Sequence, residues 1–283
     1  MSGRPGHQQE ALPDPTIRMA DGWHCLHVYY QVDPAELDKL DASARGEGRE
    51  QLIEALNPQR DGAPERLQDS AVSGHRADLG LMLLDADPLK IDAVHQAVRG
   101  SRLGAALRPT YSFVSITEVS EYVPTEEQYA EQLRADGMSE DDPAYAARLK
   151  AYAGRLPAMN KQRLYPDIPE NFEVTCFYPM NKKREADANW FLLPAPDRHR
   201  MMTEHGRTGM AFGGKVTQLI TVGVGLDDWE WGVTLWARNP EFLKDIVYTM
   251  RFDEASARYA EFGPFYTSYV ASAEEILDHC LVR

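Results

Sequence analysis

The sequence predicts an α+β fold in which two ferredoxin-like units of one chain form an α+β barrel. The first observation is the order of the C-terminal half, where strand-like and helix-like segments follow one another as β-α-β-β-α-β. This is the order of a ferredoxin-like unit. The second is that the N-terminal half repeats this order with one strand unclear. The third is the length of 283 residues, which suits two modest domains or one duplicated fold.

The N-terminal unit is expected to span residues 22–123, after a flexible tail at 1–21 that is rich in Pro, Gly and Gln. Residues 23–32 are aromatic and β-branched, which predicts the first strand. An Asp-Pro pair then predicts a helix over 34–57, kinked at its internal glycines.

Composition and alternation predict the rest of this unit. Residues 58–76 are polar and are interpreted as a loop. Residues 78–86 predict a strand, and an Asp-Pro pair predicts a helix over 88–99. Alternating apolar residues predict a last strand over 111–122.

A segment of different character follows. Residues 124–160 carry seven acidic and four basic residues, many alanines and no strand pattern. This composition predicts an acidic, mostly helical connector over 124–170 with its charges in water.

The C-terminal unit is expected to span 171–283. Pro179 is expected to end its first strand, because proline cannot donate to a sheet ladder. Gly206 is expected to end its first helix, because glycine favours that position. The predicted elements are a strand over 172–180, a helix over 196–206, paired strands over 215–225 and 229–237, a helix over 240–251, and a strand over 257–270 interrupted at Gly263-Pro264.

Charge and composition exclude several classes of protein. Thirty basic and 44 acidic residues give a net charge of −14, which argues against a generic nucleic-acid binder. No segment approaches the roughly 20 apolar residues of a membrane span, and the N-terminus does not have the form of a signal peptide. Three distant cysteines predict a reducing, cytoplasmic location without disulfides.

Common catalytic motifs are missing from the sequence, which has no P-loop, no HExxH zinc motif and no GxSxG elbow. His205 is a candidate site residue because it lies at the expected end of a helix. It is either a histidine stabilised there by the helix dipole or a proximal haem ligand that points into an apolar cavity.

Tyr178 and Gln218 also have two interpretations each. Tyr178 is either a core residue or a redox-active phenol. The Lys-Lys-Arg cluster at 182–184 is either a solvated basic turn or an anion-binding rim beside it. Gln218 lies mid-strand and either faces solvent or points inward and hydrogen-bonds over a ligand.

Eight short motifs of the second half form a specific pattern. They are YPMNKKR (178–184), NW (189–190), EHG (204–206), KVTQ (215–218), LDDWEWGV (226–233), MRFDE (250–254), SARY (256–259) and EFG (261–263). Together they resemble the chlorite dismutase family, and within it the branch whose members decarboxylate coproheme. The resemblance is strong over 172–266 and holds at the level of fold over 23–122.

The resemblance implies an iron porphyrin in the C-terminal unit, with His205 as its axial metal ligand and with Tyr178 and Lys182 as catalytic residues. Chlorite dismutases carry a distal arginine where this chain has Gln218, and actinobacterial decarboxylases carry a histidine. Glutamine therefore indicates the remaining decarboxylases. The implied substrate-binding residues are Arg163, Tyr178, Pro179, Met180, Asn181, Lys182, Gln218, Arg251 and Ser256.

The implied activity is the hydrogen-peroxide-dependent oxidative decarboxylation of Fe-coproporphyrin III (coproheme), which acts as its own redox cofactor. Two propionates become the vinyl groups of haem b, through a monovinyl tripropionate intermediate and a radical on Tyr178. A four-carboxylate substrate is repelled by a chain of charge −14. Lys182, Lys183 and Arg184 are therefore expected to form a local basic rim.

Several questions stay open at this level. Two alternative functions are a chlorite-degrading haem enzyme and a non-catalytic haem-binding or haem-transfer protein. The resemblance also implies a ring-shaped homopentamer, and transient contact with a ferrochelatase through residues 124–160 is a further option. Trp190 and Trp231 are either core residues or competing radical sites.

Overall fold

A computed structural model describes residues 14–280 and 282, so that most of the expected tail at 1–21 lies outside the described residues. Its main strands are β1 (His24–Val32), β2 (Arg66–Val72), β3 (Leu79–Asp85), β4 (Leu107–Ile116), β5 (Val174–Lys182), β8 (Val216–Val222), β9 (Trp231–Ala237), β10 (Ala260–Phe262) and β11 (Tyr266–Val270). Its helices are α1 (Pro34–Leu37), α2 (Ala42–Ala55), α3 (Pro88–Gly100), α4 (Glu126–Ala135), α5 (Pro143–Leu164), α6 (Ala195–Met210), α7 (Pro240–Met250), α8 (Glu254–Ala257) and α9 (Ala273–His279). A short hairpin, β6 (Arg184–Glu185) and β7 (Ala188–Asn189), precedes α6.

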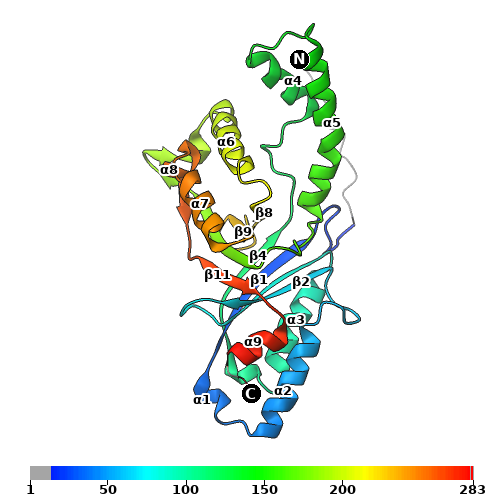
Figure 1. Ribbon diagram of the computed structural model, residues 1–283, viewed down its shortest axis with the longest axis vertical. Coiled ribbons are helices and arrows are strands. Elements are labelled where there is room, and N and C mark those ends of the chain that lie inside the picture. The colour runs from blue at the N-terminus through cyan, green and yellow to red at the C-terminus, as the bar shows by residue number, and fades with distance from the viewer. Residues whose placement is uncertain (1–13, 281, 283) are drawn as a thin grey trace, which may run out of the picture.

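The strands form an antiparallel barrel made of two ferredoxin-like sheets. The N-terminal sheet has the order β2-β3-β1-β4, and the C-terminal sheet has the equivalent order β11-β5-β9-β8. The sheets join where β11 pairs with β2 and where β4 pairs with β8, and the β5–β9 pairing closes the ring. The predicted fold class is therefore confirmed (Figure 1).

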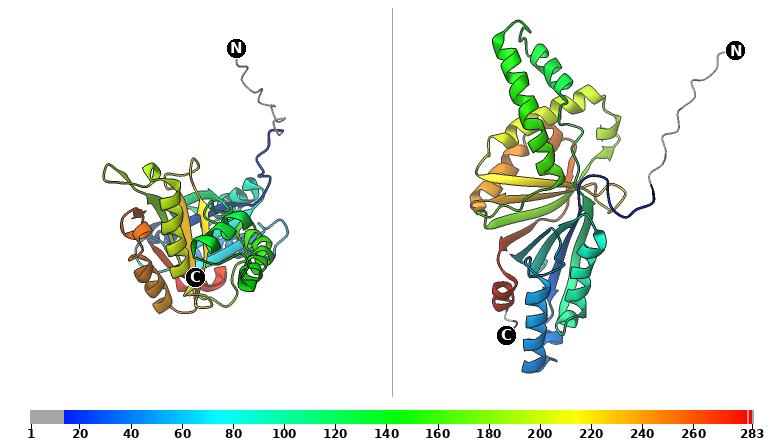
Figure 2. Two further views of the ribbon diagram at one scale, coloured as in Figure 1. Left: turned by 90° about the horizontal axis from the view of Figure 1, so that it is seen from above. Right: turned by 90° about the vertical axis from the view of Figure 1, so that its right-hand side faces the viewer.

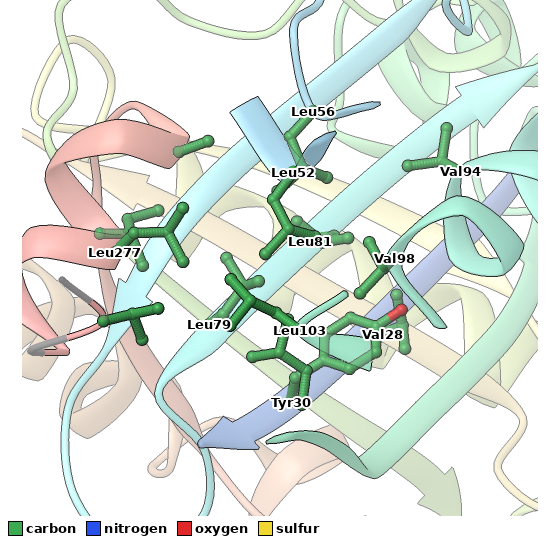
Figure 3. Packing of buried hydrophobic residues seen from close by; sticks show 14 of the residues in the cluster. Val28, Tyr30, Leu52, Leu56, Leu79, Leu81, Val94, Val98, Leu103 and Leu277 are labelled. Carbon is green, nitrogen blue, oxygen red and sulfur yellow. The ribbon is translucent and has the colours of Figure 1, made fainter. Parts of the chain in front are cut away.

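Helices cover the outer face of each sheet. In the N-terminal unit, side chains of α2, α3 and α9 pack on β3, as Leu52, Val98, Leu277 and Leu81 show (Figure 3). Helix α9 comes from the C-terminal end of the chain and closes this core. It was not predicted, although a capping box at Ser272 marks its start.

The strand that the sequence left unclear is β2, and the prediction of a loop over 58–76 is wrong for Arg66–Val72. Four of its residues, which are Leu67, Gln68, Asp69 and Ser70, are buried in succession. Three of these four are polar, so the strand lacks the apolar alternation by which strands are recognised.

The helix predicted over 34–57 is broken in a different place than expected. Helix α2 begins after Asp41, whose side chain accepts the backbone N–H of Ala44, so the break falls before the glycines. Gly48 allows a close approach instead, because a Cβ there would lie 2.7 Å from Leu103 Cγ. The strand predicted over 111–122 is β4, which begins earlier and ends at Ile116.

Two expected ends in the C-terminal unit are also wrong. Strand β5 continues through Pro179 to Lys182. The carbonyl of Pro179 accepts the N–H of Gly263, which lies in the gap between β10 and β11. A backbone N–H at position 179 would point to the same gap, where no strand residue pairs with it, so the sheet loses no hydrogen bond to the proline. Helix α6 continues through Gly206 to Met210, because nothing crowds or terminates the helix at that glycine.

Two helices lie in the segment expected to be the connector. Helices α4 and α5 form a hairpin that projects from the barrel (Figures 1 and 2). It has a small core of its own, and the rings of Tyr129 and Tyr152 stack with centroids 4.2 Å apart. No helix of the described residues is long and apolar enough to cross a membrane.

Candidate functional site

The ring of His205 is fixed by a carboxylate at the start of α8. Its Nδ1 lies 3.0 Å from Oδ2 of Asp253, a residue that is only 6% exposed. The second oxygen of Asp253 accepts the hydroxyl of Thr208 at 2.9 Å. Asp253 therefore holds the proton of His205 on Nδ1, which leaves the lone pair of Nε2 available to a metal.

Burial keeps the His205 imidazole neutral. Desolvation lowers its pKa below the usual value and outweighs Asp253, which acts in the opposite direction. The positive charge of Lys182 lowers this pKa further. A neutral ring with an oriented Nδ1–H is the form in which histidine binds metals.

Packing explains why the side of α6 that carries His205 is turned toward α8. Met201 lies one turn before His205 and is 2% exposed, in a cluster with Trp190, Ala255 and Tyr259. Residues four apart share a helical face, so α6 turns His205 toward α8 as well. This anchoring requires contacts between residues about 50 positions apart, which periodicity alone does not reveal.

Tyr178 and Gln218 lie on the same face of the C-terminal sheet. The cross-strand register aligns Tyr178 with Val233 and Ile220, and it aligns Gln218 with Leu235 of the next row. Tyr178 packs in a cluster with residues of α7, so this is the face that the helices cover. Gln218 is exposed on that face, which agrees with either of its two interpretations.

The phenol of Tyr178 is held by aromatic packing. Its ring stacks on Phe265 with centroids 4.5 Å apart and meets Phe262 edge-on at 5.7 Å. The side chain is largely buried, and burial raises the pKa of the hydroxyl above its usual value. No hydrogen-bond partner of this hydroxyl occurs among residues 14–280 and 282.

Lys182 is buried rather than part of a solvated rim. Its Nζ donates to the carbonyl of Ala255 at 3.0 Å and lies 4.2 Å from the centre of the Trp190 ring. Burial lowers its pKa to about 8, against the opposing effect of Glu230. The basic rim expected at 182–184 is therefore wrong in part, since Lys182 is buried and Arg184 is paired with Glu230.

Tyr178 and Lys182 share a face of β5 without touching. Four residues of a strand span about 13 Å, and the Lys182 ammonium points to α8. Met180 lies between them on the same face and joins the cluster of Tyr178. Strand alternation directs Pro179 and Asn181 to the opposite face. There the amide oxygen of Asn181 accepts the backbone N–H of Glu230.

The other residues expected to bind the substrate are Arg251, Ser256 and Arg163. Arg251 is exposed after α7 and is close enough to Tyr178 to oppose the rise of its pKa. The hydroxyl of Ser256 is 3.5 Å from Nδ1 of His205. Arg163 is half-buried in the last turn of α5 with no hydrogen-bond or ion-pair partner in the described chain, and burial lowers its pKa.

One contributor to the site, Asp253, was not assigned a role from the sequence. Asp253 was part of a quoted motif without a role, and its position as an N-cap residue before α8 was the available signal. Trp190 is 2% exposed, which favours the core interpretation over a competing radical site. Trp231 is partly buried on β9 and stays open between the two.

The donor set fits a metal that brings most of its own ligands. No group of three His, Cys, Asp or Glu side chains that could hold a bare ion occurs in residues 14–280 and 282. A single oriented imidazole is what an iron porphyrin requires from a protein. The partnerless guanidinium of Arg163 and the exposed Arg251 suit porphyrin carboxylates.

A cavity of about 540 Å³ lies elsewhere, between β1, β4 and α3, and none of these residues lines it. Its two histidines are engaged: His24 bonds to the carbonyl of Ile17 at 2.9 Å and His95 to the hydroxyl of Tyr30 at 2.6 Å. The candidate site therefore lies away from this cavity, in the C-terminal unit and at the end of α5.

Fold and site together define an α+β barrel with one histidine suited to a porphyrin iron. The model of the family described as chlorite dismutase matches residues 45–271. The chain belongs to the chlorite dismutase family.

Two relatives are similar to this chain over nearly its whole length. The coproheme decarboxylase of Staphylococcus carnosus is 36% identical over 259 residues, which cover 90% of this chain and 94% of the relative. That of Staphylococcus saprophyticus is 34% identical over 261 residues, covering 91% and 95%.

Solved structures agree with this assignment. A structure described as a heme-binding protein from Thermus thermophilus matches with a TM-score of 0.74 and 32% identity, over 96% of this chain and 99% of that one. Chlorite dismutase from Candidatus Nitrospira defluvii in complex with imidazole matches with a TM-score of 0.69 and 17% identity, over 94% and 97%, and supports the fold alone.

Proposed function

We propose that this protein is a coproheme decarboxylase that converts Fe-coproporphyrin III to haem b with hydrogen peroxide as the oxidant. The observation that carries the proposal is a neutral, oriented His205 in the same unit as a buried phenol, Tyr178, whose hydroxyl has no partner among the described residues. The two staphylococcal relatives are named for this reaction.

His205 would bind the iron through Nε2, with Asp253 orienting the ring from Nδ1. When bound, the porphyrin iron supplies the oxidising equivalents of peroxide. The hydrogen bond from Nδ1 to a carboxylate makes the imidazole a stronger donor to the metal. Thr208 fixes the carboxylate in turn, so the ligand is held by two successive bonds.

Tyr178 would remove the hydrogen atom. Oxidised to a radical, its phenol takes a hydrogen atom from the β-carbon of a propionate. The C–C bond to the carboxylate then breaks, carbon dioxide leaves, and the second oxidising equivalent of the peroxide takes up the second electron, which gives the vinyl group. Each propionate then consumes one peroxide and one proton and releases carbon dioxide and two waters. Stacking on Phe265 fixes the ring during this step. A monovinyl tripropionate would be the intermediate between the two rounds.

Lys182 would supply the proton that each round consumes. Its pKa of about 8 lets the ammonium give up a proton near neutral pH. Its ammonium donates to the carbonyl of Ala255 and makes no hydrogen bond to the Tyr178 hydroxyl within residues 14–280 and 282, so the proton would go to the oxygen of the peroxide that is reduced to water. Arg163, Arg251 and Ser256 would hold propionates that do not react.

Gln218 separates this proposal from a chlorite-degrading enzyme. Its neutral side-chain amide, although exposed, lacks the positive charge that would hold chlorite. A non-catalytic haem carrier would need His205 but not the buried pair Tyr178 and Lys182, whose burial carries a cost. A cytoplasmic homopentamer that receives coproheme from a ferrochelatase is the setting we propose.

The test is to load the protein anaerobically with Fe-coproporphyrin III, add peroxide stepwise and record the mass of the porphyrin. Two successive losses, each equal to the mass of formic acid, support the proposal. Unchanged porphyrin would reject it, and evolution of oxygen from chlorite would favour the chlorite-degrading alternative.

A further inference from the structure

Helix α5 carries an unusual set of charges for a chain of net charge −14. Its 22 residues contain no acidic side chain and five basic ones, which are Arg148, Lys150, Arg155, Lys161 and Arg163. None of these five forms an ion pair with any residue in the described part of the chain. On the neighbouring α4, by contrast, Arg134 pairs with Glu140.

Three of the cations form one stripe. Arg148, Arg155 and Arg163 are separated by seven and eight residues, close to two turns each, so they share a face of α5. Tyr152 lies in the same stripe, one turn from Arg148. Lys150 lies two residues beyond Arg148, roughly on the opposite side of the helix.

The stripe lies beside the segment 117–124, which contacts both α5 and α6. The hydroxyl of Tyr152 donates to the carbonyl of Pro124, and the charges of Arg155 and Arg163 both act on its pKa. Two residues before Pro124, Tyr122 packs edge-on against His199 of α6, with centroids 5.3 Å apart. The segment 117–124 thus contacts α5 on one side and α6, the helix of His205, on the other (Figure 1).

Without the arginines of α5, the segment 117–124 would repel a carboxylate. It carries Glu118 and Glu121, and burial together with the charge of Glu121 raises the pKa of Glu118. Of the cations expected at 182–184, Lys182 is buried and Arg184 is paired with Glu230, so the positive surface that they offer a polycarboxylate is reduced. The α5 stripe is exposed at Arg148 and Arg155 and has no acidic partner within residues 14–280 and 282.

We infer that the stripe formed by Arg148, Arg155 and Arg163 captures the carboxylate arms of the porphyrin substrate and guides it into the site. This inference rests on the proposed function for the identity of the substrate. Successive arginines lie about 10–12 Å apart along the helix axis, a spacing that one tetracarboxylate macrocycle can bridge. Unpaired cations act within a Debye length of about 8–10 Å, so they offset the long-range repulsion of the chain where the substrate arrives.

The test compares two charge reversals on one helix. Arg155→Glu and Lys150→Glu change the net charge of the protein equally and both lie on exposed positions, but only the first is in the stripe. The association rate of Fe-coproporphyrin III is measured by stopped-flow absorbance at low and high salt. We expect Arg155→Glu to slow association about fivefold or more at low salt, with the difference shrinking at high salt. Lys150→Glu should slow it less than about twofold.

The ligand offers a second contrast. Haem b has two carboxylates in place of four, so its association should respond less to Arg155→Glu than that of coproheme. Equal effects of the two reversals, or an effect of Arg155→Glu that salt does not change, would overturn the inference. Circular dichroism of both variants verifies that the hairpin is folded.

The outcome is separable from that of the proposed function. Product is measured independently, with saturating coproheme and the unaltered protein. If vinyl product forms while the two reversals behave alike, the α5 inference fails and the proposed function stands. If no vinyl product forms while Arg155→Glu alone slows binding, the capture role stands and the proposed function fails.

Discussion

Replacing Asp253 tests how the protein holds an iron porphyrin. In the structure, Asp253 accepts the Nδ1–H of His205 at 3.0 Å and the hydroxyl of Thr208 at 2.9 Å, at a site that is 6% exposed. Asp253→Asn keeps the shape and one acceptor but removes the charge. Asp253→Ala removes both bonds. A hydrogen bond to a charged group contributes about 1.5–3 kcal/mol, and each 1.4 kcal/mol changes an equilibrium about tenfold.

We therefore expect the affinity for Fe-coproporphyrin III to fall about 10-fold to 100-fold in Asp253→Ala. The affinity of Asp253→Asn should lie between those of the unaltered protein and Asp253→Ala. Competition by protons does not cause this loss. Asp253 raises the pKa of His205, so removing the carboxylate lowers that pKa further and makes the neutral ring more abundant. The loss reports the orientation and donor strength of the imidazole instead.

The assay is a titration of the apoprotein followed by the visible spectrum of the bound porphyrin. Glu254→Gln is the matched control, because Glu254 is the next residue and pairs only with Arg200 at the surface; its affinity should stay within about threefold. An unchanged affinity and spectrum in Asp253→Ala would refute the role assigned to the His205–Asp253 pair.

The remaining predictions concern chemistry and stability. Tyr178→Phe should bind coproheme normally but lose at least about 100-fold of its rate of vinyl formation, and a rate near that of the unaltered protein would argue against the radical. Product formation at saturating coproheme should fall as pH rises through about 8, the pKa of Lys182, and this limb should be missing in Lys182→Met. The free energy of unfolding should rise, relative to Lys182→Met, as pH rises from about 8 to 10.5, because over this range the unfolded chain holds a proton that the folded chain has lost. Leu83→Ala, at a fully buried position, should cost about 2–5 kcal/mol in urea unfolding, whereas Leu89→Ala, at a position 65% exposed, should cost under about 0.5 kcal/mol.

The fold could be predicted from sequence wherever local signals were strong. Alternation and Asp-Pro or Asn-Pro helix starts revealed most strands and helices of both units. Strand β2 was missed because three of its buried side chains, those of Gln68, Asp69 and Ser70, are polar and interrupt the apolar alternation. The ends expected at Pro179 and Gly206 failed for a related reason, since neighbouring strands and helices decide whether a chain continues through such residues.

The candidate site was predictable in its identities and less so in its geometry. The motif around His205 pointed to a metal ligand, but the partner Asp253 lies 48 residues away and only the fold brings it near. From sequence, the three adjacent cations at 182–184 were either a solvated basic turn or an anion-binding rim, and the resemblance implied a catalytic role for Lys182. The fold buries Lys182 against Trp190, which lowers its pKa to about 8 and favours proton transfer over long-range attraction of the substrate.

A crystal structure of the complex with Fe-coproporphyrin III tests the central claim most directly. We predict that Nε2 of His205 coordinates the iron and that the hydroxyl of Tyr178 lies about 3–3.5 Å from the β-carbon of a propionate. Iron bound by another side chain, or a porphyrin with all its propionates remote from Tyr178, would contradict the account.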